Sequence, residues 1–146
     1  MDYVDDIEPY QNLANAIVAQ AAHDYAQAIV DEDKGAIYTY IQFFASDWYK
    51  ILTTAQPEAM LKQIKTSADE FRELAQEALN NIEGIVTKPK EVFMCPLCGA
   101  SVRTRHVTAT VHQYKGSTVI THYNQVRCLW CELKARREVY TEEKKQ

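Results

Sequence analysis

Apolar residues follow a helical spacing in three stretches of the first half of the chain. The first stretch starts at Pro9, because the N–H that proline lacks would be unpaired in a first helical turn, and it continues to Ile29. The second covers residues 37–52 and bends at Ser46, a residue type that caps a new helical start. The third runs from Pro57 to near Gly84, since glycine favours the position just after a helix. The pattern predicts three helices.

The third stretch has the most regular apolar stripe, with alternating three- and four-residue steps over about three heptads. Its members are Leu61, Ile64, Ala68, Phe71, Ala75, Ala78 and Ile82. Such a stripe packs against the other two helices or against a second copy of the chain. We therefore expect a three-helix bundle and keep a homodimer through the third helix as the alternative.

The second half of the chain has the composition of β-structure. Residues 102–111 and 118–127 are rich in β-branched side chains, and residues 114–117 have the composition of a turn. A further short strand is expected through Val139 and Tyr140, and residues 141–146 are expected to be disordered. This half is predicted to be a small β-module.

Four cysteines stand in two Cys-x-x-Cys pairs that are 29 residues apart, Cys95 with Cys98 and Cys128 with Cys131. Two intervening residues allow a tight turn to point both thiolates at one metal ion, and two such turns supply the four sulfurs of a structural zinc site. We predict one structural Zn²⁺ in a zinc ribbon. Disulfides or free thiols are alternatives.

Three histidines lie in or beside the predicted strands, His106, His112 and His122. One of these histidines, in place of one cysteine, is an alternative ligand of the metal ion. A site filled by four protein ligands has no open position at which to activate water. The chain also lacks a nucleophile–base arrangement and a glycine-rich phosphate loop, so we expect a protein that is not an enzyme.

Charge divides the chain near residue 87. Residues 1–87 contain 15 acidic and 5 basic residues, whereas residues 88–146 contain 5 acidic and 11 basic residues. We expect an acidic helical module over residues 1–87 and a basic zinc-ribbon module over residues 88–146. The absence of a long apolar run or a leader-like start predicts a cytoplasmic protein that does not bind membranes.

Each module has a candidate binding surface. Basic and aromatic side chains of the ribbon are candidates for nucleic-acid binding, because cations pair with phosphates and exposed rings stack on bases. They are Arg103, Arg105, Lys115, Arg127, Trp130, Lys134, Arg136 and Arg137. The acidic residues of the helices are candidates for binding a protein partner by imitating the charge of nucleic acid. They are Asp24, Asp31, Glu32, Asp33, Asp69, Glu70, Glu73 and Glu77.

Two sequence runs resemble a group of helical proteins carried by bacteriophages and prophages. The runs are Asn12-Leu13-Ala14-Asn15-Ala16-Ile17 and Phe43-Phe44-Ala45-Ser46-Asp47-Trp48 with the following Leu52-Thr53. The resemblance covers about residues 10–66 and implies a phage origin and a helical fold. The run from Cys95 to Arg105 is similar to the start of phage late-gene activators of the Ogr/Delta type, although the second cysteine pair is spaced more closely than in that family.

These observations lead to two hypotheses of function. In the first, a phage-encoded zinc-ribbon protein binds and inhibits or modulates a host nucleic-acid-handling complex in the bacterial cytoplasm, in the manner of an anti-CRISPR protein. Its partner is then a host protein or a protein–nucleic-acid complex. In the alternative, the ribbon contacts nucleic acid directly and the chain is a DNA-binding transcription regulator of phage genes.

Overall fold

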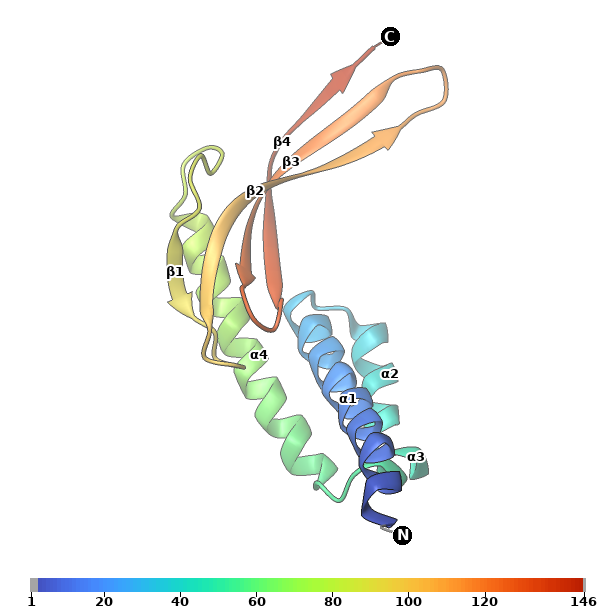
Figure 1. The fold of residues 1–146 in the computed structure, drawn as a ribbon. Coiled ribbons are helices and arrows are strands. Elements are labelled where there is room, and N and C mark those ends of the chain that lie inside the picture. Colours follow the sequence, from blue (N-terminus) through green and yellow to red (C-terminus); the bar gives the residue numbers. More distant parts are fainter. Residues whose placement is uncertain (1–2, 146) are drawn as a thin grey trace. The chain divides into compact units, whose positions relative to one another are not determined.

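A computed structural model describes residues 3–145, with side chains from residue 11 onwards, as four helices followed by four strands (Figure 1). The helices are α1 (Tyr3–Val30), α2 (Lys34–Phe44), α3 (Asp47–Leu52) and α4 (Pro57–Asn80). The strands are β1 (Glu91–Met94), β2 (Ser101–His112), β3 (Thr118–Cys128) and β4 (Lys134–Lys144). The chain forms two compact units, Met1–Asp69 and Glu70–Gln146, which divide within α4. The boundary that charge predicts after Thr87 stays a prediction.

The first unit has an aromatic core built by α1, α2 and α3. The Phe44 ring lies 6.2 Å from Tyr25 in α1 and 5.3 Å from Tyr49 in α3, between ring centroids, and all three side chains are buried. Aromatic pairs at these distances add to the stabilisation that burial gives. None of the helices in residues 3–145 is both long and apolar enough to cross a membrane.

The second predicted helix is two helices, so the expectation of three helices was too low. The Ser46 hydroxyl accepts a hydrogen bond from the Tyr49 N–H at 3.3 Å and donates one to the Phe43 carbonyl at 2.6 Å. Ser46 therefore ends one helix and caps the next, as its residue type predicted. The first helix begins at Tyr3, before the expected Pro9, in a segment whose acidic residues favour a helix N-terminus.

Most of the predicted stripe along α4 is buried within the single chain, whereas its members Leu61, Ala78 and Ile82 are half-buried. Ile64, Ala68, Phe71, Ala75 and Leu79 are all buried and follow the three- and four-residue steps of a helix. Burial of these residues agrees with a role in the core of one chain. The helix ends at Asn80, and Gly84 takes a left-handed conformation with φ 66° in the following loop.

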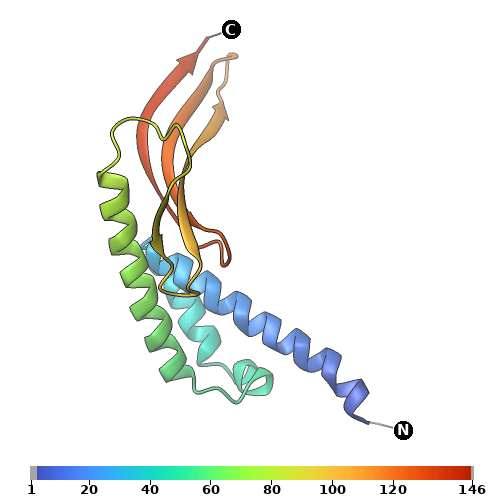
Figure 2. The ribbon, with the colours of Figure 1, turned by 60° about the vertical axis from the view of Figure 1, so that its left-hand side comes forward.

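The second unit contains a four-stranded antiparallel sheet in the order β1-β2-β3-β4. The long strands β2, β3 and β4 coil together, as Figures 1 and 2 show. The predicted hairpin between β2 and β3 is confirmed, and its turn places Lys115 and Gly116 in left-handed conformations. Strand β1 was not predicted.

Strand β4 corrects the expectation of a disordered tail. It continues to Lys144, because Thr118, Val119 and Ile120 of β3 pair with residues 142–144. An extra residue in β4 makes a bulge where the pairing shifts between His122 and Tyr123. A bulge of this kind increases the local twist of a sheet.

One face of the sheet packs on the part of α4 that belongs to the second unit. The Phe93 ring in β1 lies 5.4 Å from the Phe71 ring, and Val102 and Val126 on the same face are fully buried. The Asn124 side chain donates to the Gly84 carbonyl at 2.7 Å and accepts from the Val86 N–H at 2.9 Å. These contacts connect the loop after α4 to the centre of the sheet.

Replacement of Phe71 by Ala should lower the free energy of unfolding by about 3–5 kcal/mol, because a fully buried ring leaves a cavity beside Phe93. Urea denaturation followed by circular dichroism measures the change. The control is Gln76→Ala on the exposed side of α4, which should leave stability within about 0.5 kcal/mol of the parent. Equal stability of the two variants would contradict this packing.

Candidate metal centre and basic sheet face

The four cysteines meet at one end of the sheet. Cys95 and Cys98 lie in the turn between β1 and β2. Cys128 is the last residue of β3, and Cys131 lies in the turn that follows it. The four Sγ atoms lie within 4.8 Å of one another. The Sγ–Sγ distance is 3.8 Å between Cys95 and Cys131 and 3.3 Å between Cys98 and Cys128. A tetrahedral zinc site with bonds of about 2.3 Å has sulfur–sulfur edges of roughly 3.8 Å, so the cluster could hold a metal ion.

The two cysteine turns have matching backbone conformations. The residue after the second cysteine of each pair is left-handed, Gly99 with φ 81° and Glu132 with φ 65°. In each turn the N–H of the first cysteine donates to a carbonyl five residues later, to Ala100 at 2.8 Å and to Leu133 at 2.9 Å. Glycine adopts this conformation most readily, whereas the non-glycine Glu132 carries no such signal in the sequence.

Burial and hydrogen bonding divide the protons among the thiols unequally. Cys95 and Cys128 are buried, Cys131 is half-buried and Cys98 is exposed. The hydrogen bond from the Cys131 thiol lowers the pKa of Cys95 to about 5, and the same bond raises the pKa of Cys131. Although Cys98 is exposed as a residue, partial desolvation of its thiol raises the pKa of Cys98. A cluster that already favours one thiolate is suited to a cation, because metal ligands must lose their protons.

No disulfide joins the four cysteines, and the cluster contains no histidine. The Nε2 atom of His106 lies 2.8 Å from the Nδ1 atom of His122, and the two rings stack together on the sheet. His112 lies beside Thr118 at 3.3 Å. The four-sulfur donor set is therefore the one that the structure brings together.

Five of the predicted nucleic-acid residues share the sheet face opposite to the one that packs on α4. Arg103, Arg127 and Lys134 are direct partners across β2, β3 and β4, and they form one row. Arg105, Gln125 and Arg136 form the next row in the same way. Direct partners in an antiparallel sheet point to the same side, so the two rows make one surface, which we call the basic face.

Two carboxylates and a hollow lie at the metal end of the basic face. Glu91 pairs with Arg103 at 3.1 Å, and Glu132 pairs with Arg127 at 2.6 Å. A hollow of about 470 Å³ is lined by Pro89, Arg103, Thr104, Arg105, Arg127 and Leu129. Three arginine residues thus line one depression, which suits an anion with several oxygen atoms.

The remaining predicted basic and aromatic residues lie elsewhere in the second unit. Arg137 is opposite Asn124 on the other face, and its guanidinium donates to the Asn80 side chain at 3.0 Å. Lys115 lies in the turn between β2 and β3. Trp130 lies in the second cysteine turn with 81% of its surface exposed. The structure therefore does not bring these three residues into the two rows.

The predicted partner-binding acidic residues are divided between the two units. Asp24 and Asp31 accept hydrogen bonds from glutamines one helical turn earlier, at 2.8 and 3.0 Å, and Asp33 caps α2. Glu32 lies in the turn between α1 and α2 with φ 56°. Asp69, Glu70, Glu73 and Glu77 follow one another along α4. Several of these carboxylates thus have a structural role in a cap or a hydrogen bond.

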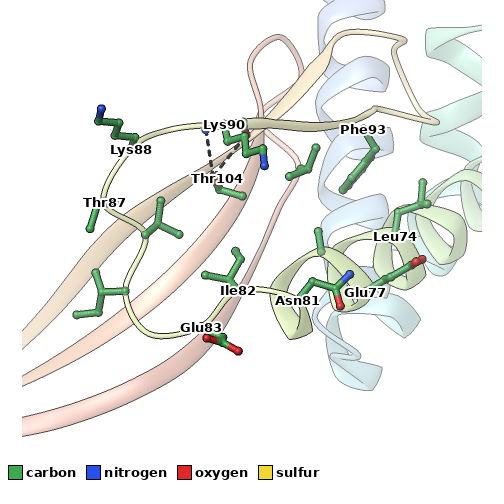
Figure 3. Close-up of a pocket in the computed structure, with 14 residues that line it drawn as sticks. Leu74, Glu77, Asn81, Ile82, Glu83, Thr87, Lys88, Lys90, Phe93 and Thr104 are labelled. Atoms are coloured by element: carbon green, nitrogen blue, oxygen red, sulfur yellow. Dashed lines mark hydrogen bonds between the residues drawn. The ribbon is translucent and has the colours of Figure 1, made fainter.

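A larger cavity, of about 570 Å³, lies between the end of α4, the loop after it and β1 (Figure 3). Apolar side chains line it together with charges of both signs, Glu77 and Glu83 on one side and Lys88 and Lys90 on the other. Thr104 closes one wall, where its hydroxyl accepts a hydrogen bond from the Lys90 N–H at 3.2 Å. Among the predicted site residues, only Glu77 lines it.

No protein-family model, curated protein or solved structure matches the chain.

Replacement of Cys95 or Cys128 by Ser should abolish stoichiometric metal binding and unfold the metal end of the sheet, since a four-ligand site does not tolerate the loss of a buried thiolate. Native mass spectrometry and elemental analysis measure the metal content. Leu97→Ala is the matched control within the same turn and should keep the metal. One equivalent of metal in both Ser variants would contradict the four-cysteine assignment.

Proposed function

We propose that this protein binds nucleic acid through the basic face of its sheet, and that one structural Zn²⁺ on the four cysteines stabilises this face. The observation that carries the proposal is the direct pairing of like charges across strands, Arg103 with Arg127 and Arg127 with Lys134. The same observation supports the second of the two hypotheses, direct contact of the ribbon with nucleic acid.

Like charges at directly paired positions destabilise a sheet. Glu91 and Glu132 each compensate one arginine, but Arg105 and Arg136 lie beyond them in the second row. A polyanion would place negative charge beside the cations of both rows, and the release of its counterions adds to the affinity. The charge pattern is therefore suited to a phosphate backbone that crosses three strands.

Zinc has a supporting role in this proposal. The fully buried residues of the sheet, among them Val102, Val126 and Leu133, make a small core for a unit of this size. Zinc that binds only the folded cluster adds its binding free energy to the stability of the sheet. Because Arg127 directly precedes Cys128, the first basic row lies next to the proposed ion and depends on it most.

Arg105→Gln and Arg127→Gln should each lower the affinity for nucleic acid and reduce the slope of log K against log salt by about 0.7–0.9, because each removes one phosphate contact. Fluorescence anisotropy with a labelled oligonucleotide over a salt series measures both changes. Arg137→Gln is the matched control, since it removes the same charge from the other face. A larger effect of Arg137→Gln than of the two other variants would contradict the basic face as the binding surface.

We also propose, as a second function, that the first unit binds a host protein of a nucleic-acid-handling complex. The supporting observation is a set of exposed apolar side chains on neighbouring helices. Trp48 and Ile51 of α3 are 65% and 74% exposed, and Leu13 and Ile17 of α1 are exposed as well. Exposed apolar side chains on helices that contact one another can contribute to a protein–protein interface, in which tryptophan is often a main contributor.

Trp48→Ser combined with Ile51→Ser should abolish capture of the protein partner without unfolding the unit, because both side chains are exposed while the neighbouring Tyr49 holds the core. Affinity purification from nuclease-treated bacterial lysate, followed by mass spectrometry, compares this variant with the parent. Lys50→Ser is the control on the same helix. Capture of the same proteins by the parent and the double variant would exclude this surface.

A further inference from the structure

We infer that the preferred ligand of the basic face is a single-stranded nucleic acid, with one unpaired base stacked on a platform formed by Tyr123 and Arg136. This inference rests on the proposed nucleic-acid binding and specifies its ligand. The platform lies directly beside the two basic rows, since Tyr123 is two residues before Gln125 and four before Arg127, on the same side of β3.

The platform is a layered pair of a ring and a planar cation. The Arg136 guanidinium carbon lies 4.2 Å from the centre of the Tyr123 ring. Tyr123 is half-buried in the central strand β3, whereas Arg136 in β4 is exposed. The guanidinium therefore lies over the ring, and because Arg136 is exposed it is accessible to another planar group.

An unpaired base is the planar group that fits this surface. Proteins that recognise single strands stack bases on aromatic rings and on arginine guanidinium planes, which also keep their positive charge beside the phosphates. Residues two positions apart on a strand are about 6.6–6.8 Å apart. A strand whose phosphates follow Arg103, Arg127 and Lys134 therefore passes within reach of the platform.

A duplex fits the same surface less well for two reasons. Its bases are already stacked and paired, so that the platform finds no free base plane. In addition, the major groove of B-form DNA, about 12 Å wide, admits a helix or a two-stranded ribbon. The basic face is three strands wide, and β1 extends the sheet further beside β2. A duplex would thus use the phosphate contacts alone.

The test compares three labelled probes by fluorescence anisotropy at equal salt: a single strand of about twelve nucleotides, the matching duplex, and a fully abasic strand of equal length. The variants are Arg136→Lys, which keeps the charge and loses the plane, and Tyr123→Ala, which removes the support. The matched control is Arg105→Lys, at the other end of the row through Gln125. All variants are checked for metal content and circular dichroism.

We expect the parent to bind the single strand more tightly than the duplex or the abasic strand. Arg136→Lys should weaken single-strand binding by about 5- to 150-fold, the range of one stacked base, while the affinities for duplex and abasic strand stay within about twofold. Tyr123→Ala should act in the same direction. Arg105→Lys should leave the ratio of single-strand to duplex affinity unchanged.

Three results would overturn parts of the proposal and can be told apart. If the parent binds none of the probes even at low salt, the proposed nucleic-acid function fails together with this inference. If it binds the probes but Arg136→Lys changes all affinities equally or none of them, the stacking platform is wrong and phosphate binding stands. Tighter binding of duplex than of single strand would likewise overturn the single-strand preference alone.

Discussion

The convergence of four thiols at one end of the sheet is the constraint on which the second unit depends. It brings the β1–β2 turn and the β3–β4 turn to the same point. The position of Cys128 opposite Val102 then fixes the register of β2 and β3, and Arg103 necessarily lies opposite Arg127. A slip of one residue would move every side chain of a strand to the other face. The cysteine cluster therefore determines which cations form the basic face.

This constraint explains how the sheet tolerates like charges in direct opposition. A strand pair with a free register can slide until arginines no longer face one another, whereas the metal ion that we propose on the four cysteines would fix the register at that end of the sheet. The ion pairs of Glu91 with Arg103 and of Glu132 with Arg127 compensate the row nearest to the cluster. In the second row, the neutral Gln125 lies between Arg105 and Arg136, so that these two cations are further apart.

Short-range rules predicted much of this architecture. The Cys-x-x-Cys spacing placed the four thiols together, and Ser46 marked the helix restart. The sequence did not reveal β1, whose four residues are too few to show an alternating pattern. The sequence also led to the wrong prediction for the end of β4, because its charged composition resembles that of a disordered tail. This segment is ordered by pairing with β3, which is distant in sequence. Arg136 and Arg137 are neighbours in sequence and therefore point to opposite faces of β4, but only the structure shows which of the two faces packs on α4.

The proposed binding face has a limited ability to discriminate among sequences. Phosphate contacts carry no sequence information, and a stacking platform accepts every base because each has a π-face. A chain that uses only this face would bind many strands alike. Selection of a target must then come from another surface, and the exposed Trp48 and Ile51 of the first unit are suited to it, because apolar side chains recognise a protein by shape. The two proposed functions are thus complementary: the first unit would select the complex, and the sheet would hold the strand that the complex handles.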